Sequence, residues 1–364
     1  MILQLVPSLA SLFPARRAAS EPPAPAIARR KRTARHAVVG FLALFLIANV
    51  VFSVGMDTLF RSVRDPEYGR RVARFHARAA ENPGRPIVAV LGSSRVSMAV
   101  RPEFANAETG PLVFNFGQVG GGPFTELMTL KRMILDGVEP KELIVEYWPP
   151  YMHQTGLYSE QSRTDLHRFF ATDESFVREW FLNSDWYVGH MHRIRWNPFY
   201  EHRMRILNQT LPSWLMHNRR ADAGWDRLDP WGWLPGYDRD LTAAERVERH
   251  KLAWDYFHRV FDQFRSDERA WLALREIVTL AKVRGMPITI LWMPESTEFR
   301  SWYPNEVLRQ GEREIEAFCR AEGISFVDAR TWVPDVHLGD GFHLNIHGAA
   351  VFSRKLGEYL RSRP

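Results

Sequence analysis

The sequence predicts an α/β protein in which helices cover both faces of a parallel five-stranded sheet, with a helical insertion and one N-terminal transmembrane helix. Short, nearly continuous apolar runs alternate with segments of helical spacing before residue 150 and after residue 267. Strands of that kind belong to parallel sheets that are covered on both sides. A stretch of about twenty uncharged residues near the N-terminus is long enough to cross a bilayer.

The composition is that of a folded protein with an uneven charge distribution. Hydrophobic residues make up 45% of the 364 positions and charged residues 25%, which indicates a globular chain. Much of the formal net charge of +6 comes from arginines and a lysine between Arg29 and Arg35, directly before the apolar stretch. That position favours membrane topology over a nucleic-acid partner. Cys319 is the only cysteine, so no intramolecular disulfide can form.

The N-terminal region predicts a cytoplasmic tail followed by a membrane span. Residues 1–35 are rich in Pro, Ala and Arg and are expected to be disordered; their short apolar start either lies on the membrane or precedes the true start codon. Residues 36–56, with the uncharged run Ala37–Met56, lack the polar face of a buried core helix. The basic cluster places the N-terminus in the cytoplasm and residues 57–364 in the periplasm or cell exterior. We therefore expect a single-pass protein of the inner (cytoplasmic) membrane.

The elements of the outward-facing domain follow from apolar periodicity and from glycine and proline stops. Strands are expected at residues 85–92, 111–117, 141–150, 286–294 and 324–330. Helices are expected at residues 65–84, 124–140, 267–285, 305–323 and 340–363.

Residues of about 151–267 differ from the rest and predict an aromatic-rich helical insertion. They hold eight tryptophans at irregular spacing, which we expect in the core more often than at a sugar-binding surface. The histidines His190, His192 and His202 lack acidic or cysteine partners at metal-ligand spacing. We therefore expect no metal site, and nothing in the sequence indicates a cofactor.

Polar residues follow three of the predicted strands. Ser93, Ser94 and Arg95 come after the first strand, residues 117–122 after the second, and the loop of residues 340–343 after the fifth. Ligands of parallel sheets bind outside the carboxyl ends of the strands. These three groups are therefore expected to meet at one rim.

The residue types at this rim fit nucleophilic catalysis. A serine needs a base within hydrogen-bond reach, and the base needs an orienting acid. Asp340 and His343 are three positions apart, so both can face the rim: His343 would take the proton of Ser94 and Asp340 would hold the imidazole. His347 is a rival base with a poorer spacing to Asp340. The backbone N–H groups of Ser94 and of the glycine-rich turn are natural oxyanion donors.

These residues resemble the SGNH, or GDSL-like, hydrolase family. The first block of the family, strand–Gly–Asp–Ser, is matched by "VLGSSRV", with Ser94 at the nucleophile position and Ser93 in place of Asp. The second block resembles "VFNFGQVGGG", and alignment on Asn115 puts the oxyanion glycine of the family on Gly120. The final block, Asp-x-x-His followed by Leu-Asn and a Gly, matches "DGFHLNIHG". The resemblance covers residues 86–149 and 267 to the C-terminus and implies a three-layer flavodoxin-like fold.

The third block departs from the family. The usual Gly-x-Asn-Asp is replaced by "VEYWPPY", so the oxyanion Asn is missing. Gly-Ser-Ser, the missing Asn and an N-terminal anchor together are similar to a membrane-anchored subset that includes the teichoic acid D-alanyl transfer protein and the alginate O-acetylation proteins. Those proteins act on cell-envelope polymers beside a membrane-bound O-acyltransferase, which is the partner that the resemblance implies here.

The expected function is that of a membrane-anchored serine esterase or O-acyltransferase. It would act on a cell-envelope or exported polysaccharide through an acyl-Ser94 intermediate, with water or a glycan hydroxyl as acceptor. Arg95, Asn115 and Glu146 are candidate substrate-binding residues, although Arg95 could instead pair with a carboxylate and Glu146 with an arginine. The alternative is a non-catalytic glycan-binding or scaffold partner of an O-acyltransferase, which the missing Asn favours.

Overall fold

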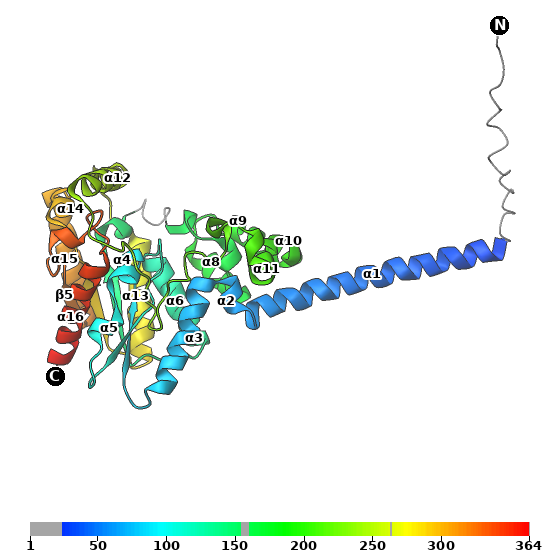
Figure 1. The fold of residues 1–364 in the computed structure, drawn as a ribbon, viewed down its shortest axis with the longest axis horizontal. Coiled ribbons are helices and arrows are strands. Elements are labelled where there is room, and N and C mark those ends of the chain that lie inside the picture. The colour runs from blue at the N-terminus through cyan, green and yellow to red at the C-terminus, as the bar shows by residue number, and fades with distance from the viewer. Residues whose placement is uncertain (1–23, 154–159, 263, 364) are drawn as a thin grey trace, which may run out of the picture. The chain divides into compact units, whose positions relative to one another are not determined.

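The computed structural model describes residues 24–153, 160–262 and 264–363 and divides the chain into two compact units, Met1–Val51 and Phe52–Pro364 (Figure 1). Helix α1 (Ala24–Thr58) supplies the first unit and continues into the second. Among the described residues, its part Arg29–Thr58 is the one helical segment that is long and apolar enough to cross a membrane, and an 18-residue window of it has a mean hydropathy of 2.6. Residues 24–35, which we predicted as disordered tail, are helical because Ala and Arg favour helix. Residues 1–23 of that tail lie outside the described residues.

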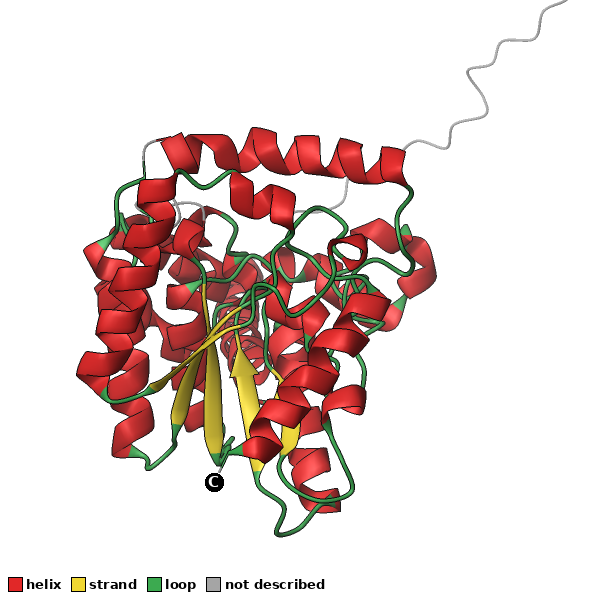
Figure 2. Ribbon diagram, turned by 90° about the vertical axis from the view of Figure 1, so that its left-hand side faces the viewer, coloured by secondary structure: helices red, strands yellow, loops and turns green. Residues whose placement is uncertain are grey.

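The second unit contains the predicted parallel sheet. Its strands are β1 (Ile87–Leu91), β2 (Leu112–Asn115), β3 (Glu142–Tyr147), β4 (Ile288–Trp292) and β5 (Ser325–Asp328). They lie in the order β2-β1-β3-β4-β5, and every neighbouring pair is parallel. Each strand falls within a predicted range. Figure 2 shows the strands in yellow with helices around them. All five carboxyl ends therefore point to one edge.

Alternate residues of the strands pack into two separate hydrophobic cores. Ala89 and Leu91 join a core with residues of α3, α6, α13 and α15, whereas Val88 and Val90 join one with residues of α4, α5 and α16. These helices are α3 (Pro66–Glu81), α4 (Ser94–Ala99), α5 (Pro102–Ala105), α6 (Pro123–Leu135), α13 (Glu268–Val283), α15 (Asn305–Glu322) and α16 (Ile346–Ser362). Helices thus cover both faces, as the strand pattern predicted.

The insertion between β3 and α13 is largely helical, as predicted, with a non-helical stretch around residues 220–242. Its helices are α8 (Glu174–Trp180), α9 (Ser184–Trp196), α10 (Pro198–Glu201), α11 (Arg203–Thr210) and α12 (Ala243–Asp262). The short helices α2 (Arg61–Arg64) and α14 (Thr297–Ser301) lie outside it. We expected its tryptophans in the core more often than at a sugar-binding surface; four of the eight, Trp186, Trp196, Trp214 and Trp254, are exposed.

Candidate active site

A tight turn after β1 presents Ser94. A Cβ on Gly92 would lie 2.3 Å from Val96 Cγ2 and 2.7 Å from Glu146 Oε2, so only glycine fits between them. The chain then enters α4, whose first residue is Ser94. The Ser93 side chain caps this helix by accepting a hydrogen bond from the N–H of Arg95. Ser93 therefore holds the turn, and Ser94 is left at the carboxyl edge of the sheet.

Three of the predicted residues form one hydrogen-bonded chain. Ser94 Oγ lies 2.7 Å from His343 Nε2, and His343 Nδ1 lies 2.7 Å from Asp340 Oδ2. Asp340 Oδ1 also accepts the backbone N–H of His343 at 2.8 Å, which fixes the loop that joins acid and base. Burial alone would raise the pKa of Asp340, but the charge and hydrogen bonds of His343 outweigh it and hold this pKa below its usual range. Asp340 is thus placed as an ionised partner for an imidazolium.

Tyr237 makes a further hydrogen bond to these three residues, one that the sequence did not reveal. Its hydroxyl donates to Asp340 Oδ2 at 3.2 Å. Tyr237 lies in the non-helical part of the insertion, where no periodicity or spacing marks it. The contact ties the insertion to the predicted triad.

A cavity of about 320 Å³ opens at Ser94 and His343. The insertion forms much of its wall, with Tyr151, Arg163 and Tyr256 as polar neighbours and Leu252, Ala253 and Phe257 as apolar ones. The remaining lining residues are Tyr237, Arg249, Asp340 and Phe342. Within the described part of the chain, no hydrogen bond is found for the Tyr151 hydroxyl. No motif or spacing in the sequence marks these residues of the insertion as neighbours of the rim.

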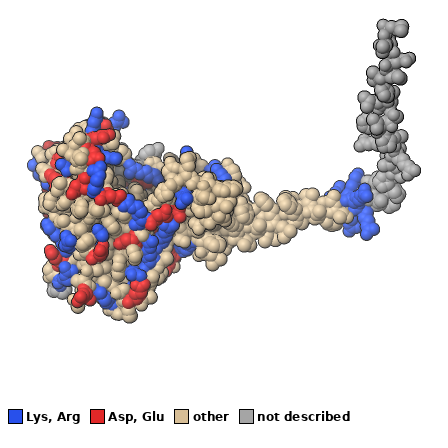
Figure 3. Space-filling model, in the orientation of Figure 1, with Lys and Arg blue, Asp and Glu red and all other residues tan. Residues whose placement is uncertain are grey.

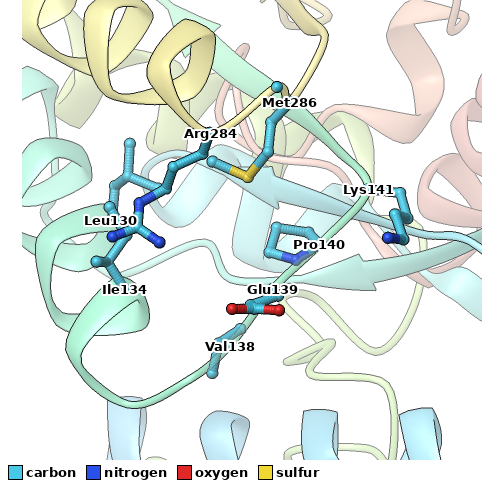
Figure 4. A pocket seen from close by; sticks show the side chains of 9 residues that line it. Leu130, Ile134, Val138, Glu139, Pro140, Lys141, Arg284 and Met286 are labelled. Atoms are coloured by element: carbon cyan, nitrogen blue, oxygen red, sulfur yellow. The ribbon is translucent and has the colours of Figure 1, made fainter.

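Another hollow, of about 280 Å³, lies away from this rim (Figure 4). Its lining includes Lys141, just before β3, and Met286, just before β4, so it sits at the amino ends of the strands. The labelled side chains are mainly apolar and include neither a serine nor a histidine (Figure 4). We therefore place the candidate site at Ser94.

Arg95 is buried beneath the serine turn and does not reach the cavity. Its Nη2 donates to the carbonyls of Met293 and Pro294 at 2.9 and 3.1 Å, and its guanidinium lies 4.4 Å from the ring centroid of Trp148. Glu146 and Glu295 lie 3.5 and 3.3 Å away as ion-pair partners. This corrects the substrate-binding alternative for Arg95, because a side chain that is 1% exposed pairs with carboxylates of the protein instead.

Glu146 and Asn115 also support the site from within. Glu146 Oε2 accepts the N–H of Ser93 at 2.7 Å. Burial raises the pKa of Glu146, and Arg95 only partly offsets this. Asn115 is fully buried; its Nδ2 donates to the carbonyls of Val96 and Val100, and its Oδ1 accepts the N–H of Gly117. The prediction that these two residues bind substrate is therefore corrected: Glu146 ties the end of β3 to the turn before α4, and Asn115 ties the end of β2 to α4.

Gly120 lies in the turn after β2 and has a φ of +78°, which favours glycine. It borders a small hollow with Thr125 and Glu160, and Arg163 lines both this hollow and the cavity at Ser94. Neither the N–H of Gly120 nor that of Ser94 donates to an acceptor within the described residues. Both groups are therefore available as hydrogen-bond donors, and their role at an oxyanion stays a prediction.

Comparisons with known proteins add remote likenesses only. No family model matches the chain, and no curated protein matches it. The chain is similar to the solved structure of a candidate acylhydrolase from Bacteroides fragilis, with 11% identity over 79% of this chain and 95% of that one and a TM-score of 0.37. It is also similar to a GDSL-like lipase from Bacteroides thetaiotaomicron, with 11% identity over 80% of this chain and 98% of that one and a TM-score of 0.36. A candidate platelet activating factor from Streptococcus pneumonia shows 12% identity over 89% of this chain and 99% of that one, with a TM-score of 0.37. These scores carry no argument about activity, so the site rests on its own geometry.

Proposed function

We propose that this protein is a serine esterase or O-acyltransferase that works through an acyl-Ser94 intermediate. The observation that supports it is the pair of 2.7 Å hydrogen bonds that links Ser94, His343 and Asp340. His343 Nε2 takes the proton of Ser94 Oγ while Oγ attacks the ester carbonyl carbon. The leaving alcohol departs with that proton. Water or a glycan hydroxyl then attacks the acyl carbon and gives its proton to His343. As the bond between the acyl carbon and Ser94 Oγ breaks, His343 passes this proton to Oγ, and the acid or the new ester leaves.

We propose three donors for the oxyanion that forms in each attack. The N–H groups of Ser94 and Gly120 have no acceptor within the described residues, and oxyanion holes are built from such free donors. The third donor is the Tyr151 hydroxyl, which lines the cavity and takes the place of the missing third-block Asn. Its own pKa is raised by burial, which keeps the hydroxyl protonated and able to donate.

The proposed substrate is a small acyl group on a cell-envelope or exported polysaccharide. The resemblance to the membrane-anchored subset supports this choice, and tyrosines at the cavity suit the apolar faces of sugar rings. We further propose that α1 anchors the chain in the inner membrane, with the N-terminus in the cytoplasm and residues 57–364 outside. A membrane-bound O-acyltransferase would then supply or receive the acyl group.

One observation favours a second candidate function. The third-block Asn is absent, so the domain could instead bind glycan or support an acyltransferase without chemistry of its own. Such a protein would retain the cavity but would need neither Ser94 nor His343.

Hydrolysis of aryl acetates by the full chain in detergent separates the two functions. Under the proposed function the wild type and the exposed control Ser301→Ala hydrolyse aryl acetates, whereas Ser94→Ala and His343→Ala do not. An inactive wild type that does not transfer acetyl to oligosaccharides would favour the non-catalytic role. Topology is tested separately with a periplasm-dependent reporter at the C-terminus: an active reporter supports the orientation, and an inactive one inverts it.

A further inference from the structure

An exposed aromatic and basic surface lies on the insertion, away from the cavity. We define the aromatic surface as the exposed apolar side chains of residues 196–216, which come from the end of α9 through α11 to the loop beyond it. Its members are Trp196, Phe199, Tyr200, Met204, Leu211, Trp214 and Met216. Trp196, Trp214 and Met216 are 69%, 72% and 69% exposed, so they contribute little to the core. Side chains of this kind mark an interaction site when they gather in one patch.

Arginines outnumber acidic residues in this segment. Residues 190–220 hold six arginines and a single acidic residue, Glu201. Arg195 and Arg205 pair with Glu174 and Asp165 from outside the segment. Glu201 is already engaged by His167 at 3.1 Å and Arg193 at 3.5 Å. Arg203 and Arg219 are exposed and pair with no carboxylate in the part of the chain that the structure describes. In Figure 3 the surface over α9–α11 shows few acidic atoms on the face in view. The surface therefore suits an anionic partner.

The same helices hold the last turns of α1. The rings of Phe52 and Phe199 stack with centroids 4.5 Å apart. Asp57 pairs with the buried Arg64 at 2.6 Å, and Arg205 Nε donates to the carbonyl of Arg64 at 3.1 Å. Directly after α1, Leu59 and Phe60 are 80% and 50% exposed. Within the Phe52–Pro364 unit, the aromatic surface therefore lies beside residues 52–60, the last turns of α1 and the two residues after it.

We propose that the aromatic surface rests on the lipid bilayer and contacts anionic headgroups. Tryptophan and tyrosine collect at the boundary between water and hydrocarbon, and arginines beside them attract anionic lipid. A docked surface would hold the Phe52–Pro364 unit against the membrane and stop it from swinging freely on its anchor. This inference rests on the membrane anchoring in the proposed function and adds a second contact to it.

Fluorescence quenching by spin-labelled lipid tests this contact in the full chain. Trp196→Cys and Trp214→Cys would carry an NBD label in phosphatidylcholine–phosphatidylglycerol vesicles, with Val283→Cys, an 80% exposed position on α13, as the matched control. The native Cys319 is buried and its pKa is raised to about 12, so it does not compete for the label. Circular dichroism checks the fold of each variant.

We expect a lipid spin-labelled near the headgroup to quench the labels at 196 and 214 about twofold or more, because both would lie in the interface, and to leave the label at 283 unchanged. Arg203→Glu combined with Arg219→Glu should reduce the quenching. The inference would be overturned if the labels at 196 and 214 stay unquenched while the protein remains in the vesicles after alkaline washing. That result would leave the membrane anchoring intact, and it is the result expected if the surface binds a protein partner instead. Release of the protein by the wash would instead refute the anchoring, and the docking with it.

Discussion

Ser94 Oγ and His343 Nε2 lie 2.7 Å apart although 249 positions separate the two residues in the chain. The distance is short because parallel strands bring their carboxyl ends to one edge, and both residues follow such an end. The proposed activation of Ser94 by His343 depends on this contact.

Replacement of the two neighbouring serines should give unequal losses of activity. Ser94→Ala removes the nucleophile and should lower kcat for aryl acetate by about 10⁴-fold or more. Ser93→Ala removes only the cap on the N–H of Arg95, which should cost about 1 kcal/mol of stability and leave most of the activity. Steady-state kinetics and urea unfolding measure the two effects. Equal activity losses would show that the nucleophile is wrongly assigned.

Asp340→Asn should lower kcat by about 10⁴-fold, because an amide in place of the carboxylate beside Nδ1 favours the wrong tautomer of the His343 imidazole. Tyr237→Phe removes one 3.2 Å hydrogen bond to Asp340 Oδ2 and should cost at most about tenfold. Comparison of kcat for the two variants with the wild type gives the result. An Asp340→Asn enzyme of normal activity would remove Asp340 from the mechanism.

Tyr151→Phe tests the proposed replacement for the third-block Asn. Loss of one oxyanion donor lowers kcat by about 10²–10³-fold, whereas KM should change little because the contact forms with the developing charge. Tyr359→Phe, on α16, is the control. A raised KM with normal kcat would instead assign Tyr151 to substrate binding.

Arg95→Met should destabilise the fold rather than weaken substrate binding. It leaves Glu146 and Glu295 buried without their positive partner, and loss of one member of a buried ion pair costs about 3–5 kcal/mol. The exposed Arg309→Met should change the unfolding free energy by less than about 0.5 kcal/mol. If Arg95→Met kept its stability and only raised KM, Arg95 would bind substrate after all.

Glu126→Gln should flatten the pH dependence of stability. Burial, with Glu146 and Glu160 nearby, raises the pKa of Glu126 well above its ordinary 4.5 in the folded state. The folded chain therefore binds more protons than the unfolded chain above pH 4.5, so the wild type loses stability as pH rises from there through the raised pKa. Urea unfolding at several pH values compares it with Glu126→Gln and the exposed Glu316→Gln. A wild-type slope that survives Glu126→Gln would contradict this assignment.

Much of the fold could be predicted because local patterns determine it. Four of the five strands are short apolar runs stopped by glycine or proline, and the meeting of Ser94 with His343 follows from the parallel order of the strands. The side chains that face inward at the rim could not be predicted. Arg95, Asn115 and Glu146 look like site residues by position, but whether they face the cavity or the core depends on buried partners such as Trp148 and Glu295 that lie far along the chain.

The insertion was the least predictable part. Tyr151 and Tyr237 reach the site from segments without periodicity, so only the folded structure brings them there. Its tryptophans divide between core and surface for the same reason. Trp180 and Trp233 are buried, whereas Trp196 and Trp214 are not, although no local pattern distinguishes them.

The most direct test of the central claim is covalent labelling of the wild-type chain by a serine-directed phosphonate, followed by mass spectrometry of the peptides. Activation of Ser94 by His343 predicts a single adduct on Ser94, absent from Ser94→Ala and strongly reduced in His343→Ala. A chain that stays unlabelled, or that is labelled equally with and without His343, would contradict the claim that Ser94 is an activated nucleophile.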